Sequence, residues 1–99
     1  MKLNMHSIHF DADPKLIDFI QKKTEKLQKL SSRIIDGEVF MRVDKKATNE
    51  NKIIEIKLNI PGNQLFAKDR SDTFEAATDK AVEALRRQLK KHKEKLTAH

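Results

Sequence analysis

The sequence predicts an α+β fold in the order β-α-β-β-β-α, with a four-stranded mixed sheet and two helices packed on one face. Three observations predict this class: two segments with apolar residues at helical spacing, four shorter segments in which apolar and polar residues alternate, and turn or cap residues between them. A chain of 99 residues leaves no room for two domains, so residues 1–99 are expected to form a single domain with a modest core.

A short half-buried strand is expected at the start, because Met1, Leu3 and Met5 alternate with polar residues. The alternation breaks before Ile8, which predicts a turn or bulge near Ser7. The first helix is then expected from about Pro14 to Leu30. Asp13 is its predicted N-cap, and proline is favoured at the first helical position. The residues that follow at helical spacing are Leu16, Ile20, Lys23, Leu27 and Leu30.

A meander of three strands is expected between the helices. The alternating apolar positions are Val39, Met41 and Val43, then Ile54, Ile56, Leu58 and Ile60, with a loose polar loop from Asp44 to Lys52. Pro61, Gly62 and Asn63 predict a tight turn, since proline presets the first bend and glycine tolerates the second. The chain is expected to return from Gln64 to Lys68, with Leu65 and Ala67 facing inward and Phe66 outward.

The second helix is expected to follow the capping residues Ser71, Asp72 and Thr73, with Glu75 placed for a capping box with Asp72. Its apolar stripe is Phe74, Ala77, Ala81, Val82, Leu85, Leu89, His92 and Leu96. A crossover helix makes the first two strands parallel neighbours if they are adjacent, and two amphipathic helices beside a sheet with polar outer residues pack on one face.

The charge balance favours a polyanionic partner. There are 21 Lys and Arg against 15 Asp and Glu, which gives a net charge of +6 and a pI of about 9.7. The absence of cysteine excludes disulfides and cysteine-ligated metals, and no apolar run has the length of a membrane span or the pattern of a signal peptide. We therefore expect a cytoplasmic protein with no cofactor, no membrane partner and no small-molecule substrate.

The basic residues of the first helix fall on one side of it. At the helical angle of about 100° per residue, five side chains lie within roughly 60° of one another: Lys15, Lys22, Lys26, Lys29 and the trailing Arg33. Such a line of like charges repels itself unless a polyanion neutralises it. Lys23 lies near the apolar seam, where its stem can pack.

The bases of the second helix divide into two flanks. Lys80, Arg87 and Lys91 form one flank and Arg86, Lys90 and Lys93 form the other, with Glu83 and Glu94 between them. Glu83 is placed for an i,i+4 pair with Arg87, and exposed helices also carry alternating charge for solubility alone. The flank of Arg87 and Lys91 is expected to join the lysines of the first helix in one basic ridge that covers consecutive phosphates.

Three groups of residues carry a resemblance to a known family. They are Leu3, Asn4 and Met5; then Leu16, Phe19, Lys23, Lys26, Leu27 and Arg33; and, most specifically, Arg87, Gln88, Leu89, Lys91, His92, Lys93, Lys95 and Leu96. Over nearly its whole length the chain resembles the short form of bacterial hibernation promoting factor and its relative, the ribosome-associated inhibitor.

The resemblance implies paired helices that present basic residues to the small ribosomal subunit and its rRNA, in the cleft where messenger and transfer RNA run. It implies inhibition of translation and storage of inactive ribosomes in stationary phase or starvation. By match to the family motif, the expected phosphate contacts are Lys23, Lys26, Arg87, Lys91, Lys93 and Lys95; helical geometry adds Lys22, Lys29, Lys80, Arg86 and Lys90. The dimerising domain of the long form is absent, so a second hibernation factor is a further candidate partner for pairing ribosomes.

Other classes stay open on the sequence alone. A double-stranded-RNA-binding domain shares the meander and the final helix, but it needs lysines at the start of that helix, where this chain has Asp72 and Glu75. Candidates for catalysis are limited to His6 and His9 with Asp11, or His92 near Glu94, without a phosphate loop or nucleophile elbow, so the protein is not expected to be an enzyme. A non-ribosomal RNA-binding module and a charged oligomeric interaction protein are the remaining alternatives.

Overall fold

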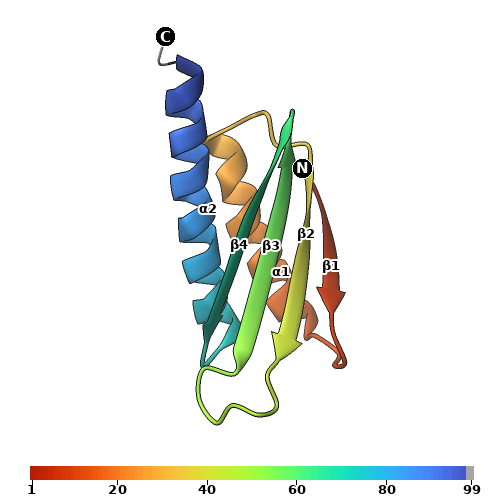
Figure 1. Cartoon of the computed structure of the whole chain (residues 1–99). Helices are drawn as coiled ribbons and strands as arrows, with labels where there is room; N and C mark the ends of the chain where they lie inside the picture. The colour runs from red at the N-terminus through yellow and green to blue at the C-terminus, as the bar shows by residue number, and fades with distance from the viewer. Residues whose placement is uncertain (98–99) are drawn as a thin grey trace.

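The computed structural model describes the backbone of residues 1–97 and the side chains of residues 1–92. Its elements confirm the predicted order and are β1 (Lys2–Ser7), α1 (Pro14–Glu25), the 3₁₀ helix η1 (Lys26–Lys29), β2 (Asp36–Val43), β3 (Lys52–Ile60), β4 (Asn63–Ser71) and α2 (Phe74–Thr97) (Figure 1). None of the described helices combines the length and the apolar character needed to cross a membrane.

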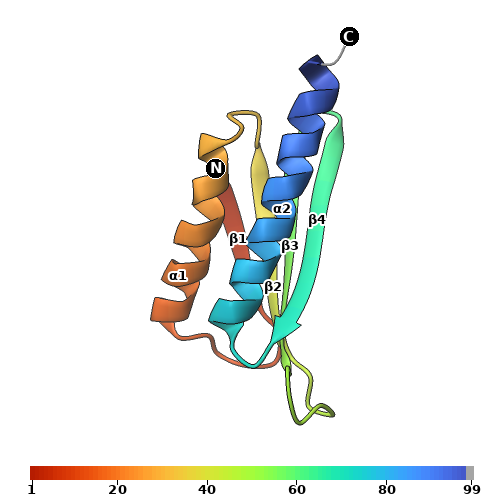
Figure 2. The same ribbon diagram turned by 90° about the vertical axis from the view of Figure 1, so that its left-hand side faces the viewer.

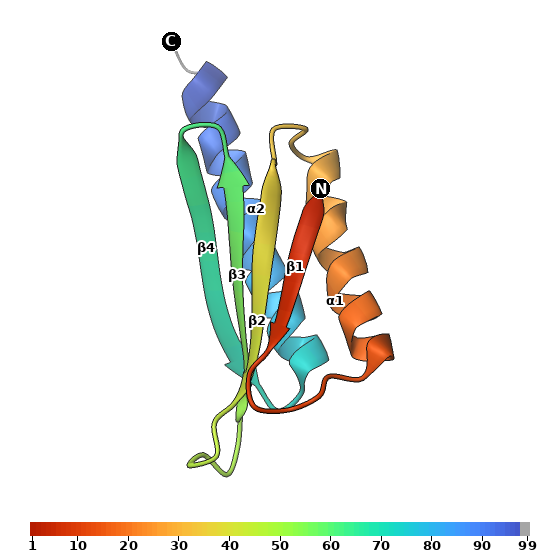
Figure 3. The ribbon, with the colours of Figure 1, turned by 90° about the vertical axis from the view of Figure 1, so that its right-hand side faces the viewer.

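The four strands lie side by side in sequence order, β1-β2-β3-β4. β1 runs parallel to β2, while β2 with β3 and β3 with β4 are antiparallel. The predicted parallel pair and the predicted meander are therefore both confirmed. α1 and α2 cover one face of this sheet and run in the same direction (Figure 2). The opposite face carries no helix (Figure 3).

The core lies between the sheet and the two helices. Ile54, Ile56 and Leu58 of the central strand β3 are fully buried beneath them. Ala77 and Ala81 are fully buried as well, and such small side chains let α2 approach the sheet closely. The inward orientation predicted for Leu65 and Ala67 is confirmed, because both are buried.

The first helix begins as predicted and changes from α-helix to 3₁₀ helix in its last turn. The Asp13 carboxylate caps it by accepting a hydrogen bond of 2.8 Å from the backbone N–H of Lys15. The helical segment extends to Lys29, close to the predicted end at about Leu30, but residues 26–29 form a 3₁₀ turn rather than α-helix. Just before this change, the buried Thr24 hydroxyl donates to the Ile20 carbonyl at 2.8 Å, a contact that commonly bends helices. The tighter turn buries Leu27 and leaves Leu30 42% exposed.

The start of α2 differs from the predicted capping box. The Thr73 hydroxyl caps the helix by accepting a hydrogen bond of 3.1 Å from the N–H of Ala76. The Asp72 carboxylate instead accepts a hydrogen bond of 2.7 Å from the N–H of Glu50, in the loop between β2 and β3. Asp72 therefore serves the loop rather than the helix.

Two α2 side chains bond the edge strand β4. The Gln88 amide donates to the Phe66 carbonyl at 2.8 Å, and the Lys80 ammonium donates to the Arg70 carbonyl at 3.1 Å. Unpaired groups on an edge strand are a template for unwanted strand pairing, so these bonds both orient α2 and protect the edge. The Phe66 side chain faces outward as predicted and is 45% exposed.

On the helix-free face of the sheet, side chains of neighbouring strands contact one another. The Glu55 carboxylate, whose side chain is only 12% exposed, lies 3.1 Å from Arg42 and 3.8 Å from Lys68. The rings of His6 and Phe40 stack on neighbouring strands with centroids 4.8 Å apart. Cross-strand contacts of this kind stabilise the sheet without a partner.

Gly37 provides a test of how closely the sheet is packed. A Cβ atom at this buried position of β2 would lie 2.7 Å from Leu58 Cδ2 and 2.8 Å from the Lys57 carbonyl oxygen. Because the carbonyl is backbone and cannot turn aside, Gly37→Ala is expected to lower the free energy of unfolding by ~1–3 kcal/mol in urea titrations. Glu38→Ala, at the next position, is the control and is expected to change it by less than ~0.5 kcal/mol. Equal stabilities for the two variants would contradict this packing.

Candidate nucleic-acid interface

The five basic residues of the predicted stripe, Lys15, Lys22, Lys26, Lys29 and Arg33, are all exposed, whereas Lys23 is half-buried. Three residues per turn in η1 place Lys26 and Lys29 directly above one another. Arg33 lies beyond the helical residues, so the continuous α-helical spacing that placed it on the stripe does not extend to it. The lysines of α1 and η1 still follow one another along the outer side of this segment.

A shallow hollow of about 540 Å³ lies where α1 meets η1, lined by Lys22, Glu25, Lys26, Gln28 and Lys29. Lys22 pairs with Asp18 at 3.0 Å, and both side chains are largely exposed. Such a pair is worth only ~0–1 kcal/mol. Lys26 and Lys29 form no ion pair with any side chain that the structure describes. This segment therefore offers ammonium groups to an anion at low cost.

Lys23 connects the two helices. Its ammonium lies 3.5 Å from the Asp79 carboxylate of α2 and 5.6 Å from the centroid of the Phe19 ring. The side chain is 37% exposed, which agrees with the predicted place near the apolar seam. Lys23 thus has an intramolecular partner that the sequence pattern did not reveal, because Asp79 is 56 residues away in the chain.

The contacts of α2 decide which of its flanks faces α1. Asp79, the partner of Lys23, shares its side of the helix with Arg86 and Lys90, at 7 and 11 residues' distance. This flank therefore lies toward α1. The predicted joining of the Arg87 flank to the α1 lysines is wrong, because α2 is rotated so that this flank lies toward β4. Lys80 on that flank bonds the Arg70 carbonyl.

The surface beside that flank is of mixed charge. A hollow of about 420 Å³ is lined by Asp69, Asp79, Lys80, Glu83, Ala84 and Arg87. Arg87 and Lys91 are exposed there. The side chains of Lys93 and Lys95, two of the expected phosphate contacts, lie outside the described residues. Three acids beside Arg87 make this hollow less attractive to phosphate than the α1 side.

Glu83 pairs mainly with Arg86. Its carboxylate accepts two hydrogen bonds from the Arg86 guanidinium, at 2.6 and 3.0 Å, and the nearest Arg87 nitrogen is 4.0 Å away. The predicted Glu83–Arg87 pair is present, but it is the weaker contact. The hydrogen bond from Arg86 lowers the pKa of Glu83, and the same bond raises the pKa of Arg86.

The histidines do not form a reaction centre in the described part of the chain. His6 stacks on Phe40. His9 is exposed and has a backbone φ of 62°, in the bend after β1. No group of three or more potential metal ligands occurs among the described residues.

Comparison with known proteins gives this surface a context. Residues 3–97 match the family described as sigma 54 modulation protein / S30EA ribosomal protein, and the chain belongs to that family. The predicted family resemblance is thereby confirmed, and so is the prediction that the protein is not an enzyme, since the family consists of non-enzymatic ribosome-binding proteins.

Two relatives share most of the chain. The ribosome hibernation promoting factor of Klebsiella oxytoca is 30% identical over 99 residues, covering all of both proteins. A protein of the same name from Pseudomonas putida is 32% identical over 95 residues, covering 96% of this chain and 89% of its own.

Two solved structures share the fold. A ribosomal subunit interface protein from Coxiella burnetii superimposes with a TM-score of 0.84 at 25% identity, covering 94% of this chain and 98% of its own. The N-terminal domain of Thermus thermophilus Protein Y has a TM-score of 0.80 at 20% identity, covering 93% of this chain and 99% of its own, and shows the fold alone. The family and the relatives from Klebsiella oxytoca and Pseudomonas putida support a ribosome-associated hibernation role for this chain.

The preference of Glu83 for Arg86 gives a prediction that NMR titration can check. Arg86→Gln is expected to raise the pKa of Glu83 back toward its ordinary value, because the main cause of the depression is lost. A depressed carboxyl pKa stabilises the folded state above the unfolded pKa, and this contribution is lost as the pH falls through the folded pKa. Arg86→Gln should therefore weaken the loss of stability in acid. Arg87→Gln is the matched control, and a larger rise of the pKa in that variant would contradict the assignment.

Proposed function

We propose that this protein inhibits translation by binding the small ribosomal subunit through its helices, and that it holds rRNA phosphates in the channel of messenger and transfer RNA. The family and the names of its relatives support ribosome association and hibernation. In this proposal the protein acts in the cytoplasm, in stationary phase or under stress, and stabilises inactive ribosomes. A second hibernation factor is the proposed partner for pairing ribosomes.

One observation carries this proposal: exposed lysine and arginine side chains lie on the adjoining sides of the two helices. We call this surface the basic helix face and define it by Lys22, Lys26, Lys29, Arg86 and Lys90. The Lys23–Asp79 pair joins the helices that carry it. Since both helices lie on one side of the sheet (Figure 2), a single RNA surface can contact basic side chains from both helices at once.

The composition of the basic helix face favours recognition of RNA phosphates over recognition of nucleobases. The chain has no Trp and no Tyr, so the usual platforms for base stacking are limited to phenylalanine. Lysine and arginine contacts to phosphate fix position without reading sequence. A protein that blocks a channel needs shape and charge rather than a base code, and this face provides them.

The remaining expected contacts have different environments. Lys23 forms an ion pair with Asp79, and Lys80 donates a hydrogen bond to a β4 carbonyl. Each therefore has an intramolecular partner before RNA is present. Arg87 and Lys91 lie on the flank toward β4 and are proposed to contact RNA that continues around α2. Lys93 and Lys95 stay proposed contacts from the family motif alone.

Charge reversal on the two parts of the surface tests the proposal. Lys26→Glu and Arg87→Glu are each expected to weaken co-sedimentation with ribosomes at least on the order of tenfold, because each places a like charge against phosphate. Binding of the wild-type protein is expected to fall steeply as monovalent salt rises. Affinities from sedimentation at several salt concentrations provide the measurement.

Lys2→Glu is the matched control, because Lys2 is exposed on β1 away from the helices. It should bind ribosomes nearly as the wild type does. If both reversals bind like the control and salt has no effect, the proposal fails, and the charged surface serves solubility or self-association instead.

A further inference from the structure

The loop between β2 and β3 is long and projects beyond the end of the sheet. It spans residues 44–51, whereas hairpin loops commonly have about 2–5 residues. In Figures 1 and 3 it extends from the end of the molecule opposite to the C-terminus, near the first turn of α2. Its first half carries Lys45 and Lys46, both exposed.

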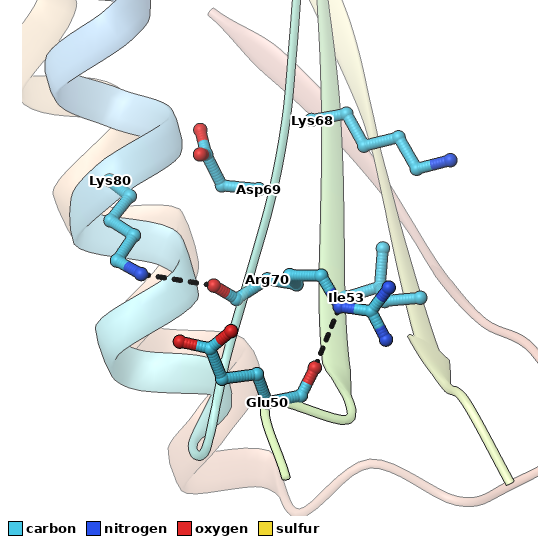
Figure 4. Close-up of a pocket in the computed structure, with 6 residues that line it drawn as sticks. All are labelled: Glu50, Ile53, Lys68, Asp69, Arg70 and Lys80. Carbon is cyan, nitrogen blue, oxygen red and sulfur yellow. Dashed lines mark hydrogen bonds between the residues drawn. The ribbon is translucent and has the colours of Figure 1, made fainter. Parts of the chain in front are cut away.

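This loop is held in place by Arg70 of β4. The Arg70 guanidinium donates from Nε to the Glu50 carbonyl at 2.8 Å and from Nη2 to the Asp44 carboxylate at 2.8 Å. One side chain thus forms hydrogen bonds with both ends of the loop. Figure 4 shows the Arg70 side chain directed at the Glu50 carbonyl, while the backbone carbonyl of Arg70 accepts from Lys80. Arg70 therefore lies between the loop and α2.

Further contacts fix the conformation of the loop. The N–H of Glu50 donates to the Asp72 carboxylate at 2.7 Å, and Glu50 has a φ of 49°, in the left-handed region that is unfavourable for this residue. The Asp44 carboxylate also accepts from the N–H of Lys46 at 3.0 Å. A loop that only had to connect two strands would not need a strained residue held by two partners.

These contacts separate the charges of the loop. The Asp44 carboxylate accepts hydrogen bonds from Arg70 and from the loop backbone. The hydrogen bond from Arg70 lowers the pKa of Asp44, which favours the ionised carboxylate that pairs with Arg70. In Figure 4 the Glu50 carboxylate lies on the side of Lys80. Lys45 and Lys46 form no ion pair with any described side chain. The projecting part of the loop is therefore basic although the segment contains two acids.

We propose that this loop is a second rRNA-binding element, in which Lys45 and Lys46 contact phosphates and Arg70 is a positioning residue that holds them in place. The inference rests on the proposed function, since it assumes that the protein binds the ribosome. The loop projects from the end of the molecule at which α1 and α2 begin, and both helices run away from it in a molecule about 48 Å long (Figure 3). Contacts at both ends fix the orientation of an elongated protein in a channel better than contacts at one end.

Salt dependence of ribosome binding tests the two lysines. Each phosphate contact contributes roughly 0.7 to 0.9 to the slope of log K against log salt concentration, so Lys45→Gln with Lys46→Gln is expected to reduce the slope by about 1.4 to 1.8. Lys2→Gln with Lys68→Gln removes the same charge from the helix-free face and is expected to leave the slope unchanged.

The positioning role of Arg70 has its own readouts. Arg70→Gln is expected to reduce the slope in the same direction and to raise the pKa of Asp44 in NMR titrations. Combined with the two loop substitutions it should reduce the slope no further, because it acts through the same lysines. If the reductions of the slope by Arg70→Gln and by the two loop substitutions simply add, the positioning role is overturned, since Arg70 then acts by another route.

A cross-link identifies the partner of the loop. The chain contains no cysteine, so Thr48→Cys at the exposed loop provides a unique attachment point for a photo-reactive group. Cross-links to rRNA in the ribosome complex support the proposal, whereas cross-links only to ribosomal protein, or none, overturn it. If the wild-type protein does not sediment with ribosomes, the proposed function fails. If it does, and the loop variant keeps the wild-type slope, the loop proposal alone fails.

Discussion

A four-stranded sheet with only two helices to cover it can bury one face, and the rest of this structure depends on that constraint. The buried apolar residues of β3, Ile54, Ile56, Leu58 and Ile60, alternate along the strand and so share the face that the helices cover, which requires both helices to pack on the same side. Their polar halves then face the same way. Basic residues that are far apart in the sequence, such as Lys26 and Arg86, thereby belong to one surface, and the opposite face pairs its own charges across the strands.

The acidic residues near the basic helix face mainly position its parts. Asp79 joins α2 to Lys23 of α1, and Glu83 holds the Arg86 guanidinium through two hydrogen bonds. On the other side, Gln88 and Lys80 attach α2 to β4. These contacts set the rotation of α2 about its axis, which decides that Arg86 rather than Arg87 faces the first helix.

Periodicity predicted the elements, the parallel pair and the core, because burial repeats at fixed spacing along each helix and strand. It did not predict contacts that join distant segments. Asp72 looked like part of a capping box, yet it bonds Glu50 of a loop 22 residues earlier. The 3₁₀ turn after Glu25 was missed because Thr24 and Leu27 suit either helix type, and it removed Arg33 from the expected stripe. Arg70 showed no pattern at all, since its role depends on where the loop ends.

In the proposed complex the basic helix face, and not the helix-free face, lies against the ribosome. Acetylation of lysines followed by mass spectrometry, on the free and the ribosome-bound protein, tests it without any substitution. Lys22, Lys26, Lys29 and Lys90 are expected to lose reactivity in the complex, while Lys2 and Lys68 keep theirs. Protection of Lys2 and Lys68 with unchanged reactivity on the helices would mean that the helix-free face binds the ribosome instead.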